Sequence, residues 1–247
     1  MDTYGLIGHP LGHSFSQGFF RDKFQGEQLD AEYLNFDVPE VHDVLEVLAA
    51  HPTLRGFNVT IPYKQQIMPY LDEVSKEART IGAVNVVKVE RKGSRTRLLG
   101  YNSDVVGFRQ SIQPFIRPHH KKALVLGTGG SAKAVYYALT HTFHLDTVCV
   151  SRFEKPGTVT YAALTPEALE EYTVIVNCTP VGMYPDISAC PPLPYDALTP
   201  RHLLFDLIYN PERTLFLRKG RQQGADTKNG LEMLLLQAIE SWRIWQQ

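Results

Sequence analysis

The chain has 247 residues and 25 lysines and arginines against 26 aspartates and glutamates, so its formal net charge is −1. This balance gives no electrostatic reason to expect binding to nucleic acid or to an anionic membrane. No apolar run is long enough to span a bilayer, and the N-terminal residues lack the basic and apolar regions of a signal peptide. Three cysteines without CxxC spacing predict reduced thiols in a cytoplasmic protein. Nine histidines without an HExxH motif predict no metal site.

The first half of the chain predicts strands that alternate with helices, which is typical of parallel βαβ units. Strands are expected at 4–8, 31–36, 57–61 and 81–87, with a return strand after a turn at Gly93. Helices are expected after Ser14, at 40–50, and over 65–80 with a break at Pro69.

Asn58, Thr60 and Lys64 follow one another at the end of the third strand. Pro62 has no N–H to donate, so it ends the strand there. Ligands bind at the carboxyl ends of strands in open α/β sheets, and a partly buried lysine can carry a proton. On this stretch alone, however, a solvent-exposed lysine is the more ordinary interpretation.

Three more polar positions in this half have both a structural and a functional interpretation. Ser14 fits a helix N-cap, but with Ser16 it could hold an anion near the helix N-terminus. Asn85 lies in an apolar run and needs a partner or a ligand. Asp104 can open the helix that follows it, or pair with Lys64 to move a proton.

The second half begins after residues 114–122, whose prolines, histidines and lysines are typical of a domain boundary. The strand 123–126 leads into Gly127-Thr128-Gly129-Gly130-Ser131-Ala132, and a helix-forming segment follows. This matches G-x-G-x-x-A, in which glycines permit a tight turn and a close approach of the backbone to a pyrophosphate at the helix N-terminus.

The next strand, 147–150, ends at Ser151-Arg152 instead of at an acidic residue, and Lys155 is close behind. An arginine there can pair with a 2′-phosphate, which indicates NADP, although Glu154 and the possibility of a solvated arginine keep this open. A strand at 173–177 leads into the loop 178–183, which should lie beside the cofactor.

The remaining segments complete an alternating pattern. They are a helix at 165–172, a strand at 203–206, a helix opened by Pro211 and closed at Gly220 or Gly224, and a last helix at 231–245. Leu231, Leu234, Leu235, Ala238, Trp242 and Trp245 form an apolar stripe on this last helix, and Gln237 lies on a neighbouring face.

Taken together, these motifs resemble the shikimate dehydrogenase family over nearly the whole chain and in the family's order. The resemblance rests on His13–Ser16, Asn58–Lys64, Ala83–Asn85, Asn102–Asp104, the glycine loop 127–132, Asn177–Met183, Asp206–Tyr209 and Gly230–Gln237.

The resemblance implies an α/β fold with two domains and a final helix that returns to the first. Residues 1–103 plus 231–247 would form the substrate-binding and catalytic domain, and residues 104–230 an NADP-binding Rossmann domain. It implies NADP as cofactor and the interconversion of 3-dehydroshikimate and shikimate, on the way to chorismate, in a cytoplasmic monomer or homodimer.

The family's functional residues then fall on positions of this sequence. Lys64 and Asp104 would be catalytic. The substrate would be held by Ser14, Ser16, Asn58, Thr60, Asn85, Tyr209 and Gln237. The cofactor would be bound by Gly127, Thr128, Gly129, Gly130, Ser131, Ala132, Ser151, Arg152, Thr179, Met183, Gly230 and Met233.

Some positions depart from the family pattern. Position 103 is serine where threonine is usual, and position 232 is glutamate where a small residue is common. The segment after Arg152 is short, which leaves NAD use open. The alternatives are a quinate/shikimate dehydrogenase with NAD or dual cofactor use, a non-catalytic cofactor-binding regulator, and a folate-type dehydrogenase. Lys64 with Asp104 disfavours the regulator, and the serine and Asn58–Lys64 motifs disfavour the folate-type enzyme.

Overall fold

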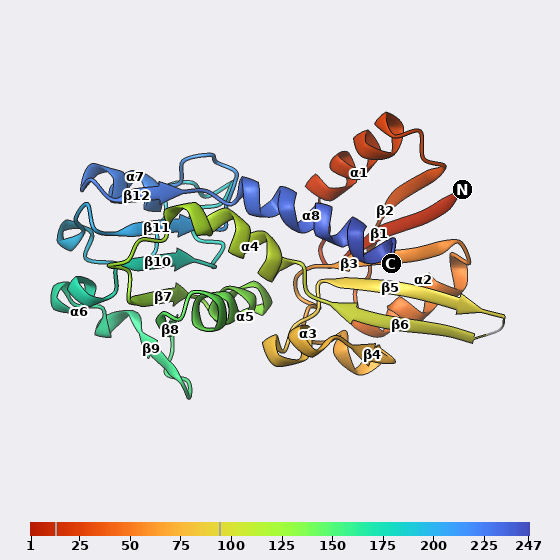
Figure 1. Ribbon diagram of the computed structural model, residues 1–247, viewed down its shortest axis with the longest axis horizontal. Helices are drawn as coiled ribbons and strands as arrows, with labels where there is room; N and C mark the ends of the chain where they lie inside the picture. Colours follow the sequence, from red (N-terminus) through yellow and green to blue (C-terminus); the bar gives the residue numbers. More distant parts are fainter. Residues whose placement is uncertain (13, 94) are drawn as a thin grey trace. The chain divides into compact units, whose positions relative to one another are not determined.

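The computed structural model describes residues 1–12, 14–93 and 95–247, which form two compact units (Figure 1). One unit combines Met1–Ser103 with Ala238–Gln247, and the other is Asp104–Gln237. Each unit contains one six-stranded sheet flanked by helices, so the expected α/β class is confirmed. The second division lies inside the last helix, between Gln237 and Ala238, and not before residue 231.

The first unit has the strand order β2-β1-β3-β5-β6-β4. Its strands are β1 (Asp2–Gly8), β2 (Ala31–Asp37), β3 (Leu54–Val59), β4 (Glu73–Val74), β5 (Val86–Lys92) and β6 (Arg95–Tyr101). Strand β1 pairs in parallel with β2 and β3, whereas β5 is antiparallel to both β3 and β6. The parallel βαβ prediction therefore holds for the first three strands.

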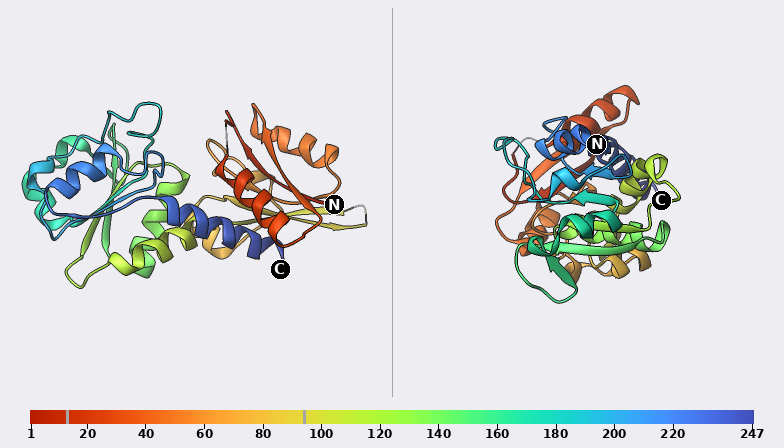
Figure 2. Two further views of the ribbon diagram at one scale, coloured as in Figure 1. Left: turned by 90° about the horizontal axis from the view of Figure 1, so that it is seen from above. Right: turned by 90° about the vertical axis from the view of Figure 1, so that its left-hand side faces the viewer.

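The helices of this unit surround that sheet. They are α1 (Phe15–Gly26), η1 (Val41–Asp43), α2 (Val44–Ala50), η2 (Met68–Tyr70), α3 (Lys76–Ile81) and the end of α8 (Leu231–Trp245). Figure 2 shows α1 and the end of α8 on one side of the sheet and α2 on the other.

Two predictions in this unit are wrong. Residues 65–80 do not form one divided helix, because η2, β4 and α3 follow one another there. Residues 81–85 precede the strand: Gly82 adopts a left-handed conformation with φ 71° and ends α3, and β5 begins only at Val86. Glycine takes this conformation without a Cβ penalty, which is why it so often ends a helix.

Aromatic side chains attach the end of α8 to the sheet. The indole of Trp245 donates a hydrogen bond to the carbonyl of Val87 at 3.0 Å, and its ring lies 4.9 Å from that of Tyr4. A Cβ on Gly56 would come within 2.3 Å of this indole, so only glycine leaves room for the ring on β3. The cluster continues through Phe20, Phe24, Tyr33 and Trp242.

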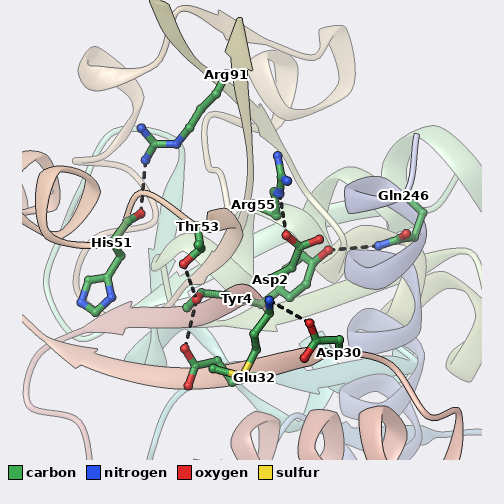
Figure 3. A network of polar contacts seen from close by, with 11 residues as sticks. Asp2, Tyr4, Asp30, Glu32, His51, Thr53, Arg55, Arg91 and Gln246 are labelled. Carbon is green, nitrogen blue, oxygen red and sulfur yellow. Dashed lines mark hydrogen bonds and ion pairs between the residues drawn. The ribbon is translucent and has the colours of Figure 1, made fainter. Parts of the chain in front are cut away.

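The amino ends of these strands are joined by polar contacts that Figure 3 shows from close by. Arg55 donates to Asp2 at 2.9 Å, and the hydroxyl of Thr3 bonds Glu32 at 3.0 Å and Thr53 at 2.9 Å. Because β1 and β3 are parallel, their carboxyl ends both lie at the opposite edge of the sheet.

The second unit has the strand order β12-β11-β10-β7-β8-β9, and every pairing is parallel. This is the doubly wound order of a dinucleotide-binding sheet, in which the direction of winding reverses between β7 and β10. The strands are β7 (Lys122–Leu126), β8 (Asp146–Ser151), β9 (Thr158–Thr160), β10 (Val174–Asn177), β11 (Leu203–Asp206) and β12 (Asp226–Lys228).

Helices pack on both faces of this sheet. They are α4 (Asp104–Ile112), η3 (Gln113–Phe115), α5 (Gly130–Tyr137), η4 (Ala138–Thr142), η5 (Tyr161–Ala163), α6 (Pro166–Glu171), η6 (Tyr195–Ala197) and α7 (Leu215–Gln222). Two details differ from the sequence analysis. Residues 114–122 lie within this unit, so they form no domain boundary. Helix α7 begins at Leu215, where Thr214 caps it, and not at Pro211.

In the region that the structure describes, no helix is both long and apolar enough to cross a membrane.

Replacing Trp245 by alanine should lower the free energy of unfolding by about 3–5 kcal/mol, because the indole is buried and would leave a cavity above Gly56. Urea unfolding would measure the loss. Ile239→Ala is the matched control on the same helix: this side chain is 54% exposed, and its removal should change stability by less than about 0.5 kcal/mol. Equal effects of the two substitutions would contradict the anchoring role of Trp245.

Candidate functional site

The carboxyl edge of the first sheet presents Thr60 and Lys64, as the sequence predicts. Strand β3 ends at Val59, and the chain then turns, with Tyr63 N–H bonded to the Thr60 carbonyl at 2.9 Å. Gly8 permits this approach, because a Cβ there would lie 2.4 Å from the Thr60 methyl group. Lys64 is half-buried, and its carbonyl accepts the N–H of Val84 at 2.7 Å. This bond fixes the backbone from which the ammonium extends.

A buried polar network lies behind this edge. The Asn58 amide donates to the Asn85 carbonyl at 3.2 Å and to the Ser241 hydroxyl at 2.9 Å, and it accepts from Tyr33 at 2.9 Å. Both hydrogens of the Asn58 side-chain amide are therefore bonded within the protein, and they brace β3 against α8. Sequence reasoning missed Tyr33 and Ser241, since Ser241 lies 183 residues away from Asn58.

Asn85 has the partner that its burial requires. Its side-chain Nδ2 donates to the Ser103 hydroxyl at 3.0 Å, and its side-chain oxygen Oδ1 accepts the Ser103 N–H at 2.7 Å. The Ser103 hydroxyl also lies 3.1 Å from that of Ser241. The serine at position 103 therefore completes the same network as Asn58.

The two serines at the start of α1 differ in burial. Ser14 is the N-cap residue by backbone position, yet its hydroxyl makes no capping hydrogen bond. Ser16 is buried, whereas Ser14 is only partly buried. The prediction that Ser14 is the N-cap residue is therefore confirmed for its backbone position, but its hydroxyl does not cap the helix. His13, from the same motif, lies outside the described residues.

Lys64 and Asp104, the proposed catalytic pair, belong to different compact units. Asp104 is the first residue of α4 and is buried, and its carboxylate accepts a hydrogen bond from Ser131 of the glycine loop at 3.3 Å. The pairing of Asp104 with Lys64 stays a prediction.

The glycine loop has the conformation that its motif requires. Gly127 has φ +118°, and a Cβ there would lie 3.3 Å from the Cys178 carbonyl, so the loop packs against the turn after β10. Gly129 is the N-cap of α5, and a Cβ there would meet nothing within 4 Å. Ala132 is buried beneath the loop. This open helix N-terminus at the winding reversal is suited to a pyrophosphate.

Two basic side chains follow β8. Arg152 is exposed and lies 5.8 Å above the ring of Phe153, while the Ser151 hydroxyl accepts the Phe153 N–H at 3.4 Å. Lys155 reaches back, and its ammonium lies 3.4 Å from the Thr128 hydroxyl in the glycine loop. Sequence reasoning noted Lys155 without making it a site residue. Lys155 lies three residues after Arg152. This spacing of two basic residues behind the strand was the signal in the sequence that could have identified Lys155.

The loops after β10 and β11 carry the next predicted residues. Met183 and Tyr209 are 47% and 38% exposed, whereas Thr179 is held by bonds from its N–H and hydroxyl to Asn177 at 3.1 and 2.7 Å. Asn177 in turn donates to Asp206 at 3.0 Å. Asp206 was quoted only as part of a motif, and sequence reasoning gave it no role.

Gly230, directly before helix α8, and Met233 and Gln237 within it are the last three predicted residues. Gly230 N–H bonds the Ile208 carbonyl at 3.1 Å, and a Cβ on Gly230 would lie only 2.0 Å from the Leu207 carbonyl oxygen. Met233 and Gln237 are buried, and the Gln237 amide donates to the Leu234 carbonyl at 2.9 Å. Glycine at 230 therefore holds the start of α8 against the loop after β11.

These features define a class of protein: a two-unit α/β protein with a dinucleotide-binding sheet in one unit and a polar strand edge in the other. Within the described parts of the chain, no group of three or more histidines, cysteines or acidic residues is placed to bind a metal.

Comparisons with known proteins agree with this class. Residues 6–87 match the family model described as the shikimate dehydrogenase substrate binding domain. The NADP(+) shikimate dehydrogenase of Methanococcus maripaludis is 36% identical, over 98% of this chain and 90% of that protein.

Two solved structures are also similar to this chain. The Thermus thermophilus shikimate 5-dehydrogenase in complex with NADP(H) and shikimate has a TM-score of 0.84 and 32% identity, over 99% of this chain and 93% of that one. Quinate dehydrogenase from Corynebacterium glutamicum, in complex with NAD, has a TM-score of 0.85 and 25% identity over the same shares.

The chain belongs to the shikimate dehydrogenase family.

Stability should fall as Asp206 ionises. Burial raises the pKa of Asp206 from 3.8 to about 6, although its hydrogen bonds to Thr214, Ile208 and Asn177 act in the opposite direction. The folded state therefore binds more protons than the unfolded state between these values, and the free energy of unfolding decreases as pH rises through them. The difference corresponds to about 3 kcal/mol.

Guanidinium unfolding of the wild type and of Asp206→Asn between about pH 4 and about pH 7 measures this effect. The stability of the wild type relative to the variant should decline over this range. A constant difference between the two proteins would contradict the raised pKa.

Proposed function

We propose that this chain catalyses the reversible NADPH-dependent reduction of 3-dehydroshikimate to shikimate, a step in chorismate and aromatic amino-acid biosynthesis. The observation that carries the proposal is similarity to an NADP(+) shikimate dehydrogenase over 98% of the chain. The glycine loop at the winding reversal and the polar edge of the first sheet supply the groups that this reaction needs.

The substrate is a polyhydroxylated carboxylate, and several of the described side chains suit it. Ser14, Ser16 and Tyr209 hold the carboxylate, with Ser14 free of a capping bond. Thr60, Asn85 and Gln237 bond the ring hydroxyls. Asn58 contributes by bracing, since its amide hydrogens are used by Asn85 and Ser241. A site built to bond hydroxyls rejects analogues without them by roughly 10⁴-fold.

Lys64 carries the proton, and Asp104 assists it. When bound, the nicotinamide supplies or accepts the hydride. In the direction of reduction, the Lys64 ammonium donates a proton to the oxygen of the carbonyl that is reduced. In the direction of oxidation, the Lys64 amine takes the proton from the hydroxyl. Asp104 orients both the lysine and that hydroxyl.

NADP is bound through backbone and basic groups. The pyrophosphate lies at the N-terminus of α5, where Thr128, Gly130 and Ser131 follow the turn at Gly127. Arg152 and Lys155 take the 2′-phosphate, and the contact of Lys155 with Thr128 supports this, because it holds a second cation at the loop. Met183, Gly230 and Met233 flank the nicotinamide. Arg152 and the short segment that follows it thus still offer two basic groups, because Lys155 lies in that segment.

The direct experiment is to incubate the protein with shikimate or quinate, each with NADP⁺ or NAD⁺, and to follow nicotinamide reduction by absorbance. We expect turnover of shikimate with NADP⁺. Preferred turnover of quinate with NAD⁺ would favour the alternative that the Corynebacterium glutamicum structure represents. Cofactor binding without any turnover would instead favour a regulator.

Replacing Lys64 by alanine should lower kcat about 100-fold or more, because the proton carrier is lost. The KM for NADP⁺ should change little. Lys76→Ala is the control, since this lysine is exposed at the start of α3. Steady-state kinetics measures both variants, and near-normal turnover by the Lys64 variant would contradict the assigned role.

Replacing Arg152 or Lys155 by alanine should raise the KM for NADP⁺ about 10-fold and leave the KM for NAD⁺ nearly unchanged. Only NADP⁺ carries the 2′-phosphate that these cations bind. Lys121→Ala, an exposed lysine before β7, is the control. Equal effects on the two cofactors would contradict the assignment.

The proposal places the enzyme in the cytoplasm. All three cysteines are free thiols, which suits a reducing compartment. A monomer and a homodimer are both compatible with the proposal, and light scattering distinguishes them.

A further inference from the structure

Asp206 is the last residue of β11, is fully buried, and accepts three hydrogen bonds. Oδ1 accepts from the Asn177 amide at 3.0 Å and from the Ile208 N–H at 3.1 Å, and Oδ2 accepts from the Thr214 hydroxyl at 2.6 Å. Among the described residues, Asp206 has no cationic partner. A buried carboxylate with only neutral donors is unfavourable, so its presence calls for an explanation.

The three donors come from three different segments. Asn177 ends β10 and, through Thr179, fixes the loop 178–184. Ile208 lies in the loop 207–214, and Thr214 both ends that loop and caps α7 by accepting the Leu217 N–H at 3.3 Å. The same two loops also meet at the Tyr184 N–H, which bonds the Asn210 carbonyl at 3.3 Å. One side chain thus joins both loops that follow the central strands.

We propose that Asp206 is a positioning residue that clamps the loop 178–184 to the loop 207–214, so that Thr179, Met183 and Tyr209 are presented to cofactor and substrate as one unit. The inference deepens the proposed function and rests on it for the ligands of these loops. Asp206 itself touches neither substrate nor cofactor in this account.

The clamp depends on the charge of Asp206. A neutral carboxyl loses an acceptor site and gains a donor, so one of the three donors loses its ideal partner when Asp206 is protonated. Burial raises the pKa of Asp206 to about 6, so this change falls close to neutral pH. Among the described residues, Asp206 contributes to the raised pKa of Cys178 and of Tyr195, and burial is the larger cause for both. Both stay neutral as Asp206 titrates.

The test compares Asp206→Asn with the wild type in two measurements between about pH 5 and about pH 8: the Kd for NADP⁺ by calorimetry and the KM for shikimate. Because asparagine resembles the protonated acid, the variant should match the wild type at the low end. The ratio of variant to wild-type Kd should rise to about 10 at the high end, with a similar rise in KM. A ratio that does not change with pH, whatever its size, overturns the proposal.

Thr214→Val provides a second test, with Thr165→Val as its matched control. Thr165 caps α6 by accepting the Ala168 N–H at 3.3 Å, the same geometry as Thr214 on α7, but it has no bond to Asp206. Both variants lose a cap, but Thr214→Val also removes a donor from the buried Asp206, so its melting temperature should fall further than that of Thr165→Val. Only Thr214→Val should weaken NADP⁺ binding, by about 3-fold or more. Equal NADP⁺ affinities of the two variants overturn the clamp.

The proposed function and the Asp206 clamp can be contradicted independently of each other. If the wild type binds NADP⁺ but does not oxidise shikimate, and the Kd ratio still changes with pH, the proposed function is contradicted and the clamp is supported. A wild type that oxidises shikimate, with a flat ratio, contradicts the clamp alone.

Discussion

Both units depend on one constraint: a polar group buried where a strand ends must find hydrogen-bond partners inside the protein. In the first unit, Asn58 meets it through Tyr33, Asn85 and Ser241. In the second unit, Asp206 meets it through Asn177, Ile208 and Thr214. Each network fixes segments that carry candidate binding residues, so the site is held in part by groups, Asn58 and Asp206 among them, that do not themselves bind a ligand.

The two edges of the first sheet have different roles: one stabilises the sheet and the other presents candidate site residues. At the amino edge, side chains bond one another and stabilise the sheet: Arg55 donates to Asp2, as Figure 3 shows, and Thr3 bonds Thr53. At the carboxyl edge, the Asn58 amide is turned inward to brace the backbone, and Asn85 is held by its hydrogen bonds to Ser103. The ammonium of Lys64 and the hydroxyl of Thr60 follow β3, where the chain turns. Such a preorganised edge suits a reaction whose hydride chemistry belongs to the cofactor.

Much of the fold could be predicted because periodicity and glycine signals are local. The bounds of α8, the strand before the glycine loop and the conformation of Gly127 all agree with the sequence analysis. The errors arose where a single residue competes with a weak pattern. Gly82 ended a helix inside an apolar run, and Thr214 capped a helix that Pro211 was expected to open.

The braces could not be predicted, for a different reason. Ser241 meets Asn58 across 183 positions, and no spacing rule relates them. The contact of Lys155 with Thr128 likewise depends on the fold of the segment between two strands. For Asp206, the sequence shows an acidic residue after an apolar strand, but burial and the three donors appear only in three dimensions. Local chemistry is therefore visible in the sequence, whereas the support behind it is not.

The most direct measurement is a crystal structure of the protein with shikimate and NADP⁺ bound. The account predicts that Lys64 and Asp104 both contact the same ring hydroxyl, at the carbon that faces the nicotinamide, and that the 2′-phosphate lies between Arg152 and Lys155. Shikimate bound with neither Lys64 nor Asp104 at that hydroxyl would contradict the account.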